Sequence, residues 1–215
     1  MKCSIILILF FYCNDVFSQS HSSMSVEKKY FHKSTASNYT GYKLYLKANL
    51  NDSVLTSDSK YTRGLDYSLR PFIELSDSLK LIFVGQLLDY ANDTTLCCMP
   101  VERYGFDGFE GLFGNPQSKR FNTQMDALVI INRLCFPYLT NMYASYPVLY
   151  DMSMKREIND NSKLITEVFQ TYKCWYEQCL TKKQILKYFP FNDTRVVWYA
   201  GKKSIEEKPK WYKCD

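Results

Sequence analysis

Two carboxylates in a glycine-rich stretch are the residues best placed to do chemistry. Asp107 and Glu110 occur in the run Gly105-Phe-Asp-Gly-Phe-Glu-Gly111, where glycines allow tight turns and aromatic rings flank the acids. Glycosidases use two carboxyl groups about 5 to 10 Å apart, and these residue types fit that chemistry. Because Asp-Gly is also common in solvent-exposed turns, the same pattern fits an acidic turn without a catalytic role.

Other catalytic and metal-binding arrangements find less support. A Ser-His-Asp or Cys-His set needs a histidine as general base, and the chain has only His21 and His32, both near its N-terminus. Zinc sites use Cys and His at short spacings, and no Cys-x-x-Cys pair occurs. No phosphate-binding loop or calcium loop appears either, so we expect no metal and no cofactor.

The first 18 residues have the pattern of a cleaved secretory signal peptide. Lys2 supplies the positive charge, and residues 4–12 form an apolar run that is too short to cross a bilayer. Small side chains at Val16 and Ser18 predict cleavage after Ser18. A buried N-terminal strand is one alternative. A lipid anchor at Cys13 is another, but lipoprotein signals place a small residue before that cysteine, and Tyr12 is large. We therefore expect a secreted or periplasmic chain.

Cysteines in an exported chain favour disulfides. Six remain after cleavage at Ser18: Cys97, Cys98, Cys135, Cys174, Cys179 and Cys214. An even count in an oxidising compartment predicts three bridges, although spacing alone does not choose among the pairings. We expect Cys214 to pair with Cys179, and Cys174 to pair within the Cys97/Cys98 or Cys135 region. A redox role for the adjacent Cys97 and Cys98 is disfavoured, because oxidoreductases use Cys-x-x-Cys at a helix N-terminus.

Composition indicates a folded domain with an aromatic excess. Hydrophobic residues make up 46% and charged residues 23%, values typical of globular proteins. The net charge of +5 is dispersed in doublets such as Lys182-Lys183, and together with export this argues against a nucleic-acid partner. Aromatic residues make up 16%, which predicts either a bulky core or an aromatic binding face.

Four Asn-x-Ser/Thr sequons lie in stretches that we expect to be loops or element ends. They are at Asn38, Asn51, Asn92 and Asn192. Each is a candidate glycosylation site if the source modifies its exported chains.

Periodicity predicts one α+β domain over residues 38–215, dominated by helices and completed by a small antiparallel sheet and disulfides. Residues 19–37 are polar and lack a period, so we expect a flexible lead-in. Strands are predicted at 42–48, at 195–199 and in a hairpin over 148–158, with a long loop over 49–70. Helices are predicted at 77–91, 122–136, from about 160 to 178, and 182–188. Asn132 falls in the apolar stripe of the second helix, so we expect a hydrogen-bonded core amide there.

Taken together, these features favour a binding or interaction protein over an enzyme. A sizeable exported domain with abundant Tyr and Trp is suited to contact a protein or a glycan. The alternative is a secreted hydrolase of glycans that depends on Asp107 and Glu110. No membrane-spanning segment follows the signal peptide, because the next apolar run, residues 81–84, is too short.

Overall fold

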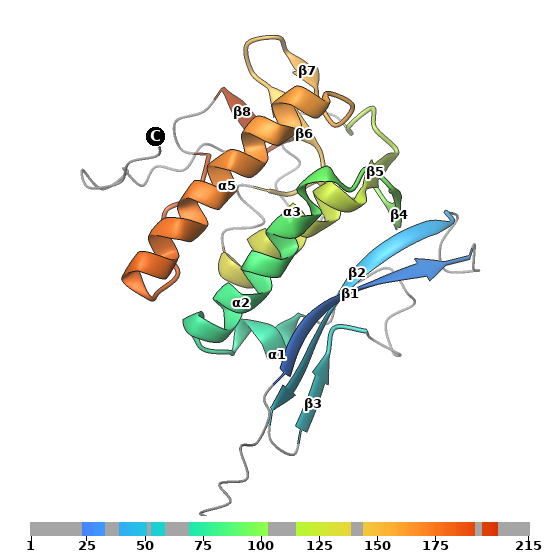
Figure 1. Cartoon of the computed structure of the whole chain (residues 1–215). Coiled ribbons are helices and arrows are strands. Elements are labelled where there is room, and N and C mark those ends of the chain that lie inside the picture. The colour runs from blue at the N-terminus through green and yellow to red at the C-terminus, as the bar shows by residue number, and fades with distance from the viewer. Residues whose placement is uncertain are drawn as a thin grey trace, which may run out of the picture.

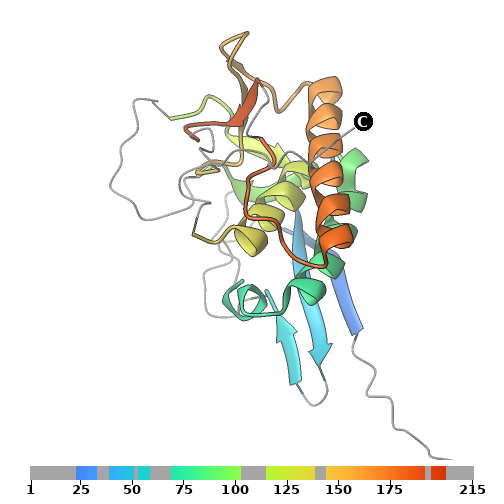
Figure 2. The ribbon, with the colours of Figure 1, turned by 90° about the vertical axis from the view of Figure 1, so that its left-hand side faces the viewer.

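Within the residues that the structure describes, the fold combines four α-helices with two sheets. The computed structural model describes residues 23–32, 39–50, 53–58, 69–102, 115–138, 144–191 and 195–201. Helices α2 (Asp77–Leu88), α3 (Thr123–Cys135) and α5 (Ser162–Lys182) lie on one side of the larger sheet, and the small sheet lies at the upper end of these helices (Figure 1). Seen from the side, strands β1 to β3 of the larger sheet lie at the lower end of the helices and the small sheet lies at the upper end (Figure 2). The α+β class predicted from the sequence is confirmed.

The larger sheet has mixed strand directions. Its strands are β1 (Ser23–Phe31), β2 (Gly41–Leu50), β3 (Ser53–Thr56), β4 (Leu96–Pro100) and β5 (Arg120–Asn122). The strand order is β1-β2-β4-β5, and β3 also pairs with β2. The pairing of β2 with β4 is parallel and consists of Tyr42 opposite Cys97, whereas the other pairings are antiparallel. The sequence pattern did not predict a sheet of this size.

The small sheet has the order β7-β6-β8 and is antiparallel. It consists of β6 (Leu149–Asp151), β7 (Arg156–Glu157) and β8 (Val196–Trp198). Asp151 shapes the turn between β6 and β7, because its Oδ1 accepts hydrogen bonds from the amides of Ser153 and Met154 at 2.8 and 3.0 Å. These bonds, with one from the Ser153 hydroxyl, lower the pKa of Asp151. The predicted hairpin over 148–158 is confirmed.

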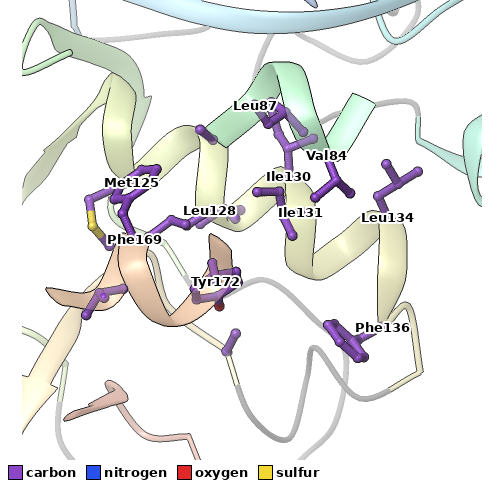
Figure 3. Close-up of a cluster of buried hydrophobic side chains, with 14 of the residues drawn as sticks. Val84, Leu87, Met125, Leu128, Ile130, Ile131, Leu134, Phe136, Phe169 and Tyr172 are labelled. Carbon is purple, nitrogen blue, oxygen red and sulfur yellow. The ribbon is translucent and has the colours of Figure 1, made fainter. Parts of the chain in front are cut away.

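Helix α3 forms the centre of the core. Its side chains meet those of α2, such as Val84 and Leu87, and those of α5, such as Phe169 and Tyr172 (Figure 3). Most of its residues are buried, including the polar Asp126 and Asn132. The apolar stripe read in the sequence accounts for one buried side of the helix, and the polar residues Asp126 and Asn132 are buried with it.

Three polar groups inside the core are joined by hydrogen bonds. The Tyr172 hydroxyl donates to Asn132 Oδ1 at 2.6 Å and accepts from Trp198 Nε1 at 3.1 Å. This chain joins α3, α5 and β8, and it confirms Asn132 as a hydrogen-bonded core amide. Burying these groups without partners would cost about 1 to 3 kcal/mol each.

Helix ends lie close to the predicted positions. Asn122 caps α3 by accepting from the Met125 amide at 3.1 Å, and Asn161 caps α5 by accepting from the Leu164 amide at 3.1 Å. Helix α2 begins at Asp77 as expected and continues as the 3-10 turn η1 (Asp89–Asn92). The short helix α1 (Arg70–Ile73) precedes it.

Three local predictions were wrong. The flexible lead-in over 19–37 contains β1, which pairs with β2 along its full length, so the folded domain includes residues before 38. The pattern was missed because β1 is an edge strand with polar residues on both faces. The helix predicted at 182–188 is absent, since Lys182 is the last residue of α5 and Lys183 adopts a left-handed conformation that ends the helix. Strand β3 likewise lies inside the loop expected over 49–70.

The prediction of three disulfides was also wrong. None of Cys97, Cys98, Cys135 and Cys179 forms a disulfide, which excludes the expected Cys179–Cys214 pair and a bridge from Cys174 to Cys97, Cys98 or Cys135. Cys174 is disulfide-bonded, and no disulfide joins two described residues. Cys97, Cys98 and Cys179 are buried among apolar neighbours, where cysteine packs as a small hydrophobic residue. The domain therefore gains its stability mainly from its core.

Thiol labelling tests this assignment. In denaturant without reductant, iodoacetamide should modify Cys97, Cys98, Cys135 and Cys179, because none of them is bridged. In the native protein Cys97, Cys98 and Cys179 should react far more slowly, since all three are buried. Peptide mapping by mass spectrometry reads out each site. Protection of any of the four in denaturant, reversed by reductant, would show that it forms a disulfide.

Gly41 permits the close approach of β2 and β4. A Cβ atom at this position would meet the Leu96 carbonyl oxygen and would lie 2.9 Å from both the carbonyl carbon of Cys97 and the amide nitrogen of Cys98. All three are backbone atoms, which cannot move aside without separating the strands. At Gly85 in α2, the added Cβ would instead meet the hydroxyl end of Tyr176 at 2.6 Å.

These two glycines form a matched pair for mutation. Gly41→Ala should lower the free energy of unfolding by about 2 kcal/mol or more, because the core backbone must shift. Gly85→Ala should change it by less than about 1 kcal/mol, because alanine favours the helix and the Tyr176 side chain can rotate. Urea denaturation of both variants provides the comparison. Equal losses would mean that the β2–β4 contact is not a rigid constraint.

Candidate binding cleft between the two sheets

The residues singled out for chemistry do not form a described catalytic site. Asp107 and Glu110 lie in 103–114, and His21 lies before Ser23, so all three are outside the described residues. His32 is exposed and contacts the ring of Tyr30, with 5.0 Å between the ring centroids. Within the described ranges, no group of three or more His, Cys, Asp or Glu side chains is arranged to hold a metal ion.

Of the four sequons, one can be placed. Asn92 is the last residue of η1 and is exposed, as a glycan acceptor must be. Asn38, Asn51 and Asn192 lie outside the described residues.

The described aromatics serve mainly the core. Trp175 and Trp198 have no exposed surface, and Phe136 packs against Trp175 with ring centroids 5.3 Å apart. Phe136 also contacts Phe189 at 5.2 Å. Of the two explanations for the aromatic excess, a bulky core accounts for these residues.

An open, mainly polar cleft of about 500 Å³ lies where the two sheets approach each other. One wall is formed by β5 and the residues just before it, and the other by β7 and the residues that lead into α5. Strands β5 and β7 lie near each other at the upper right of Figure 1. The polar lining includes Ser118, Arg120, Asn122, Arg156, Glu157 and Asp160. Sequence reasoning missed this cleft, because its walls come from segments about 35 residues apart that no motif connects.

Glu157 fastens the two walls together. Its carboxylate accepts hydrogen bonds from the backbone amides of Gln117 and Ser118 at 2.6 and 2.8 Å and from the Ser118 hydroxyl at 2.5 Å. Bonds from several donors to one carboxylate are among the stronger hydrogen bonds in proteins. Since these donors occupy both oxygens, Glu157 has a structural role and is poorly suited to act as an acid or base.

Arg120 is anchored at the base of the cleft. Its Nη2 donates to the carbonyl oxygens of Thr40 and Cys97 at 2.6 and 3.2 Å, and its guanidinium lies 5.0 Å from the ring centroid of Tyr39. Its Nε is buried and finds no acceptor among the described residues. Arginine therefore ties β5 to β4 and to the residue before β2.

Two charged side chains at the cleft remain available to a partner. Arg156 and Asp160 are both exposed, and neither has a hydrogen bond or ion pair to another described side chain. Asn159, between them, is occupied: its Oδ1 accepts from the Leu149 amide at 2.8 Å and its Nδ2 donates to the Pro147 carbonyl at 3.0 Å. The cleft thus has a fixed frame, lined by a cation and a carboxylate that no described side chain pairs.

A buried carboxyl group supports the sheet behind the cleft. Asp126 Oδ2 in α3 accepts from the Leu44 amide of β2 at 2.9 Å, just beyond the point where β2 and β4 pair. Burial raises the pKa of Asp126 to about 7, although the Leu44 amide and the charges of Lys43 and Arg133 oppose that shift. Burial also raises the pKa of the nearby Cys97 thiol, which disfavours a reactive thiolate there.

Comparisons with known proteins do not identify a family. The chain matches no protein-family model, and no curated protein or solved structure shows significant similarity to it. None of the described helices is long and apolar enough to cross a membrane.

The titration of Asp126 makes stability depend on pH. Between about pH 4 and pH 7 the folded protein keeps a proton on Asp126 that the unfolded chain has lost, so the free energy of unfolding falls as pH rises. The slope from this group is at most about 1.4 kcal/mol per pH unit. Above pH 7 its contribution becomes constant.

Asp126→Asn isolates this contribution. The amide oxygen can still accept from Leu44, but the side chain no longer ionises. Between about pH 4.5 and pH 7.5, the free energy of unfolding of the variant should therefore rise by a few kcal/mol relative to that of wild type. Denaturant unfolding of both proteins at both pH values measures the difference. A difference between the two proteins that does not change with pH would show that Asp126 titrates normally.

Proposed function

We propose that this protein is an exported binding protein and that its partner occupies the cleft between β5 and β7. The observation that carries the proposal is an open polar cavity of about 500 Å³, a size typical of ligand sites. The signal-peptide pattern of residues 1–18 supports export.

The construction of the cleft favours binding over catalysis. Hydrogen bonds to Glu157, Arg120 and Asn159 hold its walls in one arrangement, which lowers the entropy cost of association. Arg156 and Asp160 also line the cleft, and their exposed charged groups have no partner among the described side chains. Catalysis by paired carboxylates requires two carboxyl groups that are not held by structural hydrogen bonds. Among the described lining residues, only the carboxyl group of Asp160 meets this condition.

The hydrolase alternative depends on Asp107 and Glu110. Incubation of the mature chain with a panel of glycans, with Asp107→Asn/Glu110→Gln as control, addresses it directly. Release of sugar by wild type but not by the double variant would favour the hydrolase over a binding protein.

A charge reversal at Arg156 tests the binding proposal. The Arg156 side chain has no hydrogen bond or ion pair to a described side chain, so Arg156→Glu should leave folding intact. The substitution reverses the charge at this position of the cleft. The mature protein is immobilised and used to capture proteins and glycans from its own extracellular medium. We expect capture by wild type to fall at least about tenfold in Arg156→Glu.

Arg70→Glu is the matched control. Arg70 is 92% exposed in α1, and its only described ion pair, to Glu74, is a solvent-exposed contact of 3.8 Å. This variant should capture as wild type does. Equal capture by all three proteins would place the binding surface elsewhere, and no capture would contradict a binding role in that medium.

A further inference from the structure

Strand β5 is the last strand of the larger sheet, and its outer edge is unpaired by any described residue. Two hydrogen bonds show which way its backbone groups point. The Val101 amide donates to the Lys119 carbonyl at 3.2 Å, and the Thr123 amide donates to the Thr95 carbonyl at 2.8 Å. In an antiparallel pair of strands, bonds of this kind lie on either side of two facing residues that do not bond to each other. The backbone N–H and C=O groups of those two residues point away from the partner strand.

The flanked pairs are Pro100 with Arg120 and Leu96 with Asn122. The backbone groups of Arg120 and the amide of Asn122 therefore point away from β4. Both residues line the cleft. The cleft wall thus presents backbone N–H and C=O groups at positions where a further strand could pair with β5.

The opposite wall has the same property. Strand β7 is the last strand of the small sheet, and the Ile158 amide donates to the Leu149 carbonyl at 3.0 Å. That bond flanks the pair of Tyr150 with Glu157, so the backbone of Glu157 points away from β6. Two strand edges therefore border one cavity.

Resting on the proposed function, we infer that the partner is a protein and that an extended segment of it adds to β5 as a further strand. Main-chain hydrogen bonds to a free sheet edge are a general mode of peptide recognition. Three residues of β5 span about 10 Å, which matches a peptide segment of three or four residues in the cavity.

A glycan is a poorer match to the same cleft. Sugar rings commonly stack on exposed aromatic faces, and Phe121, the one aromatic residue among the described lining residues, is only 2% exposed. A polypeptide, in contrast, has alternating N–H and C=O groups at the spacing that β5 offers.

The test uses peptides of known sequence. Extended peptides that bind the full mature chain are selected from a displayed random library, and synthetic copies are then N-methylated one residue at a time. If the peptide pairs with β5, methylation at alternate residues should weaken binding about tenfold, and methylation at the residues between should have little effect. Uniform tolerance of N-methylation would overturn strand addition.

A protein variant tests the same edge from the other side. Arg120→Pro removes the outward amide, and proline is tolerated where a strand faces away from its neighbour. Its matched control is Arg120→Ala, which loses the same guanidinium contacts but keeps the amide. We expect the selected peptide to bind Arg120→Pro several-fold more weakly than Arg120→Ala, with circular dichroism confirming that both fold. Equal affinities would contradict pairing at Arg120.

A glycan array separates failure of this inference from failure of the proposed function. Binding of a glycan that Arg156→Glu abolishes, with no peptide selected, would overturn strand addition and leave the cleft as a binding site. Absence of any ligand sensitive to Arg156→Glu would overturn both.

Discussion

The hydrogen bond from the Leu44 amide to Asp126 is the interaction on which the layered arrangement depends. Strands β2 and β4 pair at one point and then separate, which exposes a backbone donor of β2 to the apolar centre of the molecule. An unpaired amide in that place would cost about 1 to 3 kcal/mol, and Asp126 supplies its acceptor. Helix α3 can therefore pack directly against the sheet. The raised pKa of Asp126 is the consequence of placing a carboxyl group there.

From that contact the rest of the architecture follows in order. Gly41 allows the strands to touch at their one pair, and α3 then fills the space that opens beyond it. Because α3 is buried on all sides, α2 and α5 must cover it, and Tyr172 links α5 to α3 and β8 through Asn132 and Trp198. The small sheet is held to the larger one through Glu157, so the cleft is a product of how the two sheets are joined.

The sequence predicted the long helices α2, α3 and α5 well because each has apolar residues at helical spacing that follow a polar residue at the N-cap. It missed the short α1 and predicted a helix at 182–188 that is absent. The apolar stripe of α3 and the Asn161 cap of α5 could both be read from neighbouring residues. Strands β1, β4 and β5 were missed for different reasons. Strand β1 is an edge strand that carries polar residues. Strand β4 is short and ends at a proline, and β5 has only three residues. The cleft could not be predicted, since Glu157 binds backbone amides about 40 residues away and no side-chain pattern records such a contact.

The free edge of β5 is unusual enough to need a reason. Exposed strand edges invite unwanted pairing between chains, and proteins limit this with short strands and charged side chains. Both devices are present, because β5 has three residues and begins with Arg120. The edge is nonetheless left facing a cavity and not covered by any described residue. A short edge inside a cleft admits a narrow extended segment and resists pairing with a second whole sheet. This combination of access and protection is what a selective strand-binding site requires.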